Sequence, residues 1–139
     1  MAATRTALDY YAKVTDLTFT EVTDSSSAAG DLRFAKSGAP STAWAYLPSG
    51  HTSGGDVWFG PGSYYNDMSE GTYGFQTLLH EIGHALGLHH PHDNSDGIVG
   101  TGANDWVGIS LMSYKSFDGA ANGYRQDYYT TTPMYNDIA

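Results

Sequence analysis

The pattern of apolar and polar side chains along the sequence predicts two helices and several short strands. Between residues 4 and 15 the apolar positions recur at helical intervals, which predicts a first amphipathic helix. Four later stretches alternate apolar with polar side chains or form short apolar runs bounded by glycine and proline, as strands do. We therefore predict strands at residues 17–22, 31–35, 42–47 and 54–59.

The second predicted helix begins near Thr72 and has one continuous apolar face. The residues of that face are spaced by three and four positions: Phe75, Leu78, Leu79, Ile82 and Leu86. Such spacing indicates a face buried in a core, so side chains on the opposite face project from a rigid support. Gly87 should end this helix, because glycine enters the left-handed conformation without steric penalty.

The polar face of the same helix carries the residues of a metal site. His80 and His84 lie one helical turn apart, so both imidazoles can reach one ion. A sharp turn at Gly87 would bring His90 back towards that ion. Three neutral histidines leave the fourth position of a tetrahedral zinc open, which distinguishes a catalytic site from a structural one. We predict a catalytic zinc ion held by these three histidines.

Glu81 is the candidate general base. It is offset from His80 by about 100° around the helix axis, too far to join the ligands but close enough to touch a water on the metal. A single histidine in a helix is more often packed or solvated than bound to metal. The prediction therefore depends on the complete set of His80, Glu81, His84, Gly87 and His90.

A second motif, Ser-Leu-Met-Ser-Tyr at residues 110–114, follows the first. Together the two motifs resemble the metzincin clan of zinc endopeptidases. Pro91, directly after the third histidine, makes the chain most similar to the serralysin family. His89 and His92 stand where small residues are usual in that family, and we treat both as non-ligands.

The resemblance implies an α+β fold. A twisted mixed sheet of about four strands would be backed by the first helix and the active-site helix, followed by an irregular part that contains a Met-turn. We expect one catalytic domain over residues 1–139, with an upper subdomain of about 1–87 and a lower one of about 88–139. In that family the sheet has a further strand before the first helix, and calcium-binding repeats follow the last helix. Neither is found here, so we expect a short form of the domain.

The resemblance also implies roles for residues outside the zinc helix. Met112 would lie beneath the zinc as the methionine of the Met-turn. Tyr114 matches a tyrosine that can bind the metal at rest and later stabilise the oxyanion, so we expect it as both ligand and catalytic residue. The sheet edge above the cleft would be formed by Ala43, Trp44, Ala45 and Tyr46, where an extended peptide can add as a strand. Ordinary packing is the alternative for Trp44 and Tyr46.

The amino-acid composition limits the kinds of partner that the chain can bind. Fifteen acidic and six scattered basic residues give a net charge of −9, which argues against nucleic acid. The chain has no cysteine and no run of eighteen apolar residues, so we expect neither disulfides nor a membrane span. The stretch 92–106 is rich in oxygen donors, which could hold calcium or be plainly solvated: Asp93, Asn94, Asp96, Asn104 and Asp105.

The leading hypothesis is a zinc-dependent endopeptidase that acts on extended protein or peptide substrates. By resemblance we expect it to be secreted, although no signal peptide is present, and to accept a proteinaceous inhibitor. We expect a monomer unless another chain supplies the missing strand. Two alternatives stay open: a non-catalytic module that binds peptide or metal, and a metalloenzyme that acts on another amide or ester.

Overall fold

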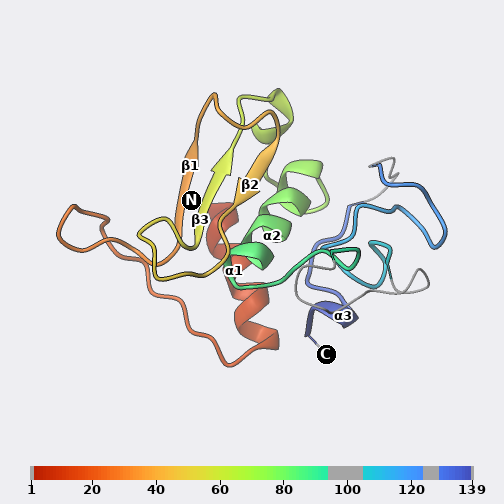
Figure 1. The fold of residues 1–139 in the computed structure, drawn as a ribbon, viewed down its shortest axis with the longest axis horizontal. Coiled ribbons are helices and arrows are strands. Elements are labelled where there is room, and N and C mark those ends of the chain that lie inside the picture. Colours follow the sequence, from red (N-terminus) through yellow and green to blue (C-terminus); the bar gives the residue numbers. More distant parts are fainter. Residues whose placement is uncertain (1, 94–104, 124–128, 139) are drawn as a thin grey trace.

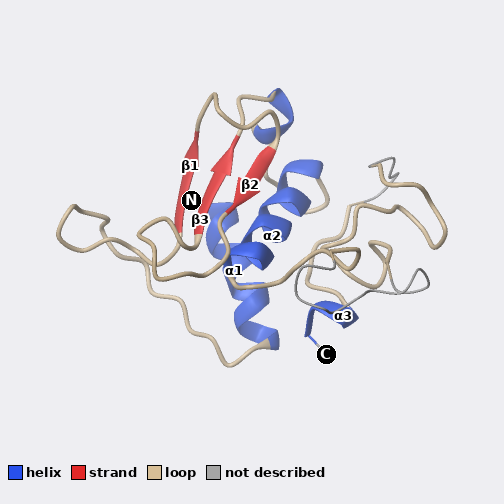
Figure 2. Ribbon diagram, in the orientation of Figure 1, coloured by secondary structure: helices blue, strands red, loops and turns tan. Residues whose placement is uncertain are grey.

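The computed structural model describes residues 2–93, 105–123 and 129–138. Its elements, in chain order, are α1 (Ala2–Val14), β1 (Arg33–Lys36), β2 (Ala43–Ala45), β3 (Asp56–Phe59), the 3₁₀ turn η1 (Ser63–Tyr65), α2 (Tyr73–Ala85) and α3 (Tyr135–Ile138). The strands and the first two helices gather on one side of the molecule, and the chain after α2 forms an irregular region on the other (Figures 1 and 2). The α+β prediction is confirmed.

The three strands form one mixed sheet in the order β1-β3-β2. β1 runs parallel to β3, with Phe34 opposite Val57, and β2 runs antiparallel to β3, with Trp44 opposite Trp58. The predicted strands at 31–35, 42–47 and 54–59 are therefore confirmed, each with shorter or shifted bounds. β2 lies at an edge of this sheet, as expected.

The strand predicted at residues 17–22 is wrong. This stretch follows α1 and pairs with no strand among the described residues. Phe19 packs against the core, but Leu17 and Val22 are 45% and 60% exposed. Alternating side chains show which face a strand would bury, yet a strand also needs a neighbouring strand to bond to, and this stretch bonds to none of the three described strands. The sheet has three strands rather than about four.

The core lies between the sheet and the two long helices. α2 packs against α1, β2 and β3, and its apolar residues Phe75, Leu78, Leu79 and Ile82 are buried as predicted. The Tyr11 hydroxyl of α1 donates a hydrogen bond to the carbonyl of Leu79 at 2.8 Å. Burial raises the pKa of this hydroxyl, so it stays protonated and keeps donating. The packing fixes α2 as the support of the metal site.

Both ends of α2 are capped by the residues that the sequence indicated. Thr72 precedes the helix, and its side chain accepts a hydrogen bond from the Phe75 N–H. At the other end Gly87 has a φ of 106°. The Gly87 N–H bonds to the His84 carbonyl at 2.9 Å and the Leu88 N–H to the Gly83 carbonyl at 2.9 Å. These two bonds form a Schellman motif, which stops the helix and reverses the chain.

The region after α2 has little regular structure in its described part (Figure 2). It contains turns around residues 106–114 and the short α3. The division into subdomains near residue 87 stays a prediction. Among the described residues, no helix has the length and apolar character needed to cross a bilayer.

We predict that Gly87→Ala lowers the free energy of unfolding by about 1–2 kcal/mol, because an alanine in the left-handed region carries a steric cost within its own backbone. Space is not the cause, since a Cβ on Gly87 would meet nothing closer than Pro48 Cγ at 3.8 Å. Urea denaturation of the zinc-loaded chain measures the change. Gly38→Ala is the control, because Gly38 has no positive φ and nothing lies within 4 Å of its added Cβ. Equal stability of the two variants would contradict the prediction.

Candidate metal centre

Three imidazoles converge where α2 ends. His80 and His84 project from the helix, and the turn at Gly87 brings His90 back towards both. His90 Nε2 lies 3.2 Å from His80 Nε2 and 3.0 Å from His84 Nε2. One ring nitrogen from each of the three histidines lies within 4.8 Å of a ring nitrogen of the other two. The structure therefore brings together the three ligands that the sequence predicted.

The outer nitrogens of two rings are held by backbone carbonyls. His80 Nδ1 lies 2.9 Å from the Leu111 carbonyl, and His84 Nδ1 lies 2.7 Å from the Leu88 carbonyl. A carbonyl can only accept, so each Nδ1 carries the proton and each Nε2 presents a lone pair. These carbonyls orient the two rings as a metal site requires.

The three histidines are neutral at physiological pH. Burial, followed by the neighbouring imidazoles, lowers the pKa of His80 to about 3 and that of His90 to about 4. Burial also lowers the pKa of His84. Neutral imidazole is the form that binds a metal ion.

The donor set fits zinc. Tetrahedral zinc with Zn–N bonds of about 2.0–2.1 Å separates its nitrogen ligands by about 3.3 Å. The Nε2 separations of 3.0 and 3.2 Å are close to that value. Three protein ligands leave a further position on the ion for water or substrate, which is the arrangement of catalytic zinc sites.

Glu81 borders the three histidines. It is 6% exposed, and its Oε2 makes no hydrogen bond to any described residue. Burial raises the pKa of its carboxyl to about 8. Burying a carboxyl oxygen without a hydrogen-bond partner is costly, and carboxyl groups with shifted pKa values are common at functional sites.

Met112 packs beneath α2, the helix that carries His80 and His84. It is 1% exposed, and its Sδ would be only 2.6 Å from a Cβ placed on Gly83. Gly83 therefore lets the turn approach the helix closely. The preceding residue, Leu111, supplies the carbonyl that holds His80. The turn thus contacts the metal site by packing and by a hydrogen bond.

Asp137 at the start of α3 anchors this turn. Its carboxylate accepts hydrogen bonds from Ser110 Oγ at 2.7 Å and from the N–H groups of Leu111 at 2.9 Å and Met134 at 2.7 Å. The bond to Met134 also caps the helix, because a side chain in the first turn reaches back to the N-cap N–H. Burial raises the pKa of Asp137, and these bonds partly offset it. Sequence reasoning missed this residue.

Tyr114 packs among the ligands. Its ring centroid lies 4.4 Å from that of His90 and 5.6 Å from that of His80. Burial, followed by the nearby Glu81 carboxylate, raises the pKa of the Tyr114 hydroxyl. The phenol is therefore protonated at neutral pH and can donate a hydrogen bond.

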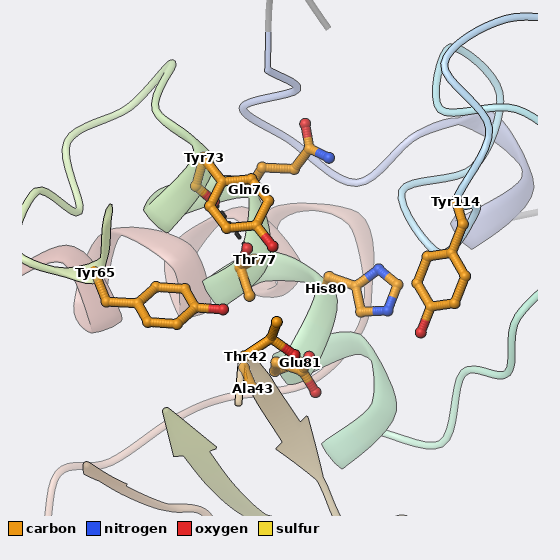
Figure 3. Close-up of a pocket in the computed structure, with 9 residues that line it drawn as sticks. All are labelled: Thr42, Ala43, Tyr65, Tyr73, Gln76, Thr77, His80, Glu81 and Tyr114. Atoms are coloured by element: carbon orange, nitrogen blue, oxygen red, sulfur yellow. Dashed lines mark hydrogen bonds between the residues drawn. The ribbon is translucent and has the colours of Figure 1, made fainter. Parts of the chain in front are cut away.

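Two cavities meet at the centre. One, of about 170 Å³, is bounded by Thr42, Ala43, Tyr65, Tyr73, Gln76, Thr77, His80, Glu81 and Tyr114. Tyr65 and Tyr114 approach it from opposite sides (Figure 3). The other, of about 280 Å³, is bounded by Ala43, Trp44, Ala45, Leu47, Glu81, His84, His89, His90, Asp93 and Tyr114. Three residues, Ala43, Glu81 and Tyr114, line both, so the two cavities adjoin at the candidate base.

Comparison with known proteins assigns the family. A family model described as matrixin (peptidase M10) matches residues 1–100. The chain belongs to the matrixin family.

The matrixin chain is also similar to curated bacterial proteases. It is 37% identical to serralysin C of Dickeya chrysanthemi over 152 residues, which cover 96% of this chain and 30% of the relative. It is 36% identical to serralysin A of the same organism, over 99% of this chain and 31% of the relative. Metalloprotease AprA of Pseudomonas entomophila (strain L48) is 36% identical over 96% of this chain and 30% of its own length. The chain thus spans about a third of these relatives.

The structure also shows where the residues expected at the sheet edge and in the stretch 92–106 lie. Trp44 lines the second cavity, whereas Tyr46 lies beyond β2 and borders neither cavity. Most of the stretch 92–106, which could hold calcium or be plainly solvated, lies outside the described residues. Of its oxygen donors, Asp93 and Asp105 are described, and the Asp105 carboxylate bonds to Ser113 and Lys115.

We predict that Asp137→Asn lowers the free energy of unfolding by about 1–3 kcal/mol, because an amide has only one acceptor oxygen for three donors. Urea denaturation measures the change. The control is Asp9→Asn at an exposed position of α1, where we expect a change within about 0.5 kcal/mol. Similar losses in both variants would show that the bonds to the turn at Leu111 contribute little.

Proposed function

We propose that this matrixin domain is a zinc-dependent metalloendopeptidase. The observation that carries the proposal is a cluster of three neutral imidazoles beside the buried Glu81 carboxyl, whose Oε2 has no hydrogen-bond partner among the described residues, and these groups line two cavities. The relatives named serralysin and metalloprotease support the same activity. His80, His84 and His90 would hold the ion.

We propose that an extended substrate binds along β2. The Gly60 N–H bonds to the Thr42 carbonyl and the Tyr46 N–H bonds to the Asp56 carbonyl, so Thr42 and Tyr46 direct their backbone groups towards the β3 side. In an antiparallel strand this direction alternates, which leaves the N–H and C=O groups of Ala43 and Ala45 on the free edge. An added strand would pair with those two alanines and lie across both cavities. Backbone pairing selects a peptide over a small ester.

The proposed reaction is peptide hydrolysis. Zinc, when bound, would lower the pKa of the attacking water and polarise the scissile carbonyl. Glu81 would take the proton from the attacking water and deliver it to the leaving amine. The Tyr114 hydroxyl would donate a hydrogen bond to the oxyanion as negative charge develops there. Met112 would support the ligands from beneath and take no part in proton transfer.

We further propose that the protein acts on protein substrates outside the cell, as its similarity to serralysins implies. A non-catalytic module that binds peptides remains the second candidate, because a zinc site and a free strand edge are all that such a module needs. Cleavage assays separate the two.

We predict that the zinc-loaded chain cleaves casein and that Glu81→Ala lowers kcat by about a hundred- to ten-thousandfold, because the proton acceptor is lost. Zinc content, measured by atomic absorption, should stay at one ion per chain. Glu70→Ala is the control, because Glu70 is exposed and lines neither cavity. Full activity of Glu81→Ala would remove Glu81 from the mechanism. No cleavage by the zinc-loaded parent would favour the binding module.

We predict that Tyr114→Phe lowers kcat on the order of a hundredfold and leaves KM nearly unchanged, because its hydroxyl acts on charge that develops only in the transition state. Steady-state kinetics on a fluorogenic peptide measure both constants. Tyr135→Phe is the matched control at a tyrosine that is 75% exposed. An unchanged kcat in Tyr114→Phe would argue against the oxyanion role.

A further inference from the structure

We propose that Asp105 is a positioning residue that holds Tyr114 against the metal centre by binding the residues on both sides of it. The inference rests on the proposed function, because it assigns a use to the Tyr114 hydroxyl. Asp105 itself lines neither cavity. It therefore acts through Tyr114 rather than on a substrate.

The two neighbours of Tyr114 both bond to one carboxylate. Ser113 Oγ donates to Asp105 Oδ1 at 2.6 Å, and Lys115 Nζ lies 2.7 Å from Asp105 Oδ2. Asp105 is 1% exposed and Ser113 is fully buried. The backbone reinforces this arrangement, because the Lys115 N–H donates to Ser113 Oγ at 3.1 Å and the Val107 N–H to the Lys115 carbonyl at 2.9 Å. The residues on both sides of Tyr114, Ser113 and Lys115, are thus held in place by the same carboxylate.

Regular structure does not fix Tyr114. The residues around it form turns and one isolated bridge between Lys115 and Gly123, and no helix or ladder of strands contains them. A side chain on such a segment keeps its position only where other groups hold the backbone. The buried carboxylate of Asp105 is the charged group that does so here.

The charge of Asp105 is stabilised by its partners. Burial alone would raise the pKa of its carboxyl, but the hydrogen bonds from Lys115 and Ser113 bring the pKa below its ordinary value. The carboxylate is therefore ionised at neutral pH and bonds to Lys115 in an ion pair whose acidic partner is buried. Removal of one partner of such a pair is costly, because the other charge stays buried.

The same carboxylate lies near the third ligand. His92 Nδ1 is 3.8 Å from Asp105 Oδ2, and the His92 ring stacks on that of His90 with centroids 5.1 Å apart at 10°. The His92 ring also lies 5.3 Å from that of Tyr114. Asp105 thus borders a stack of side chains that ends at the metal ligand His90.

The test is a double-mutant cycle of Asp105→Asn and Tyr114→Phe, read as kcat and KM on the fluorogenic peptide. If Asp105 acts through the Tyr114 hydroxyl, Asp105→Asn lowers kcat about tenfold in the parent but less than about twofold in the Tyr114→Phe background. KM should change little in either. An equal loss of kcat in both backgrounds would overturn the proposal, because independent effects multiply.

Folding is controlled separately. Urea denaturation shows whether Asp105→Asn is folded under assay conditions, and Asp118→Asn provides the same substitution at an exposed site in the same region. If Asp105→Asn does not fold, Ser113→Ala replaces it in the cycle, because it removes one of the two anchors and keeps the ion pair to Lys115. The same non-additivity with Tyr114→Phe is required.

A measurement without turnover distinguishes this proposal from the proposed function. The ring resonances of Tyr114 are identified in an NMR spectrum of tyrosine-labelled chain by their loss in Tyr114→Phe. We expect them to shift or broaden in Asp105→Asn and to stay unchanged in Asp118→Asn. Unchanged resonances in a folded Asp105→Asn would overturn the positioning role. Absence of cleavage by the parent would overturn only the proposed function.

Discussion

The left-handed backbone of Gly87 is the constraint on which the metal centre depends. Because φ there is 106°, the helix stops and the chain turns back within three residues, which brings His90 to His84. The same turn presents the Leu88 carbonyl to His84 Nδ1 and the Leu88 N–H to the Gly83 carbonyl. One turn therefore ends the helix, orients the second ligand and delivers the third.

The centre is supported from below by a part of the chain that is remote in sequence. The Leu111 carbonyl orients His80, and Met112 packs where Gly83 leaves room for it. Asp137 holds that turn in place through bonds to the N–H of Leu111 and the hydroxyl of Ser110. The helix that carries His80 and His84 is thus fixed by the core on one side and by an anchored turn on the other, an arrangement that keeps the geometry of the two histidines.

Much of the site could be predicted because its determinants are local. The ligands, the candidate base and the turn that joins them lie within residues 80–90, where helical periodicity and glycine conformation are sufficient guides. Pairing partners are not local, which is why residues 17–22 suggested a strand that the sheet does not contain. Asp137 was missed and Asp105 was considered only as a possible calcium donor for the same reason, because an aspartate in a polar stretch gives no sign of the distant donors that fold against it. Gly83 gave no sign either, since its role depends on the approach of Met112.

The compactness of the ligand set in sequence has a consequence for how the chain can vary. His84 and His90 are only six residues apart, so closing the turn that joins them costs little chain entropy. A change in chain length outside residues 80–90 would leave this closure as it is. The domain can therefore change size elsewhere without lengthening the link between its three histidines.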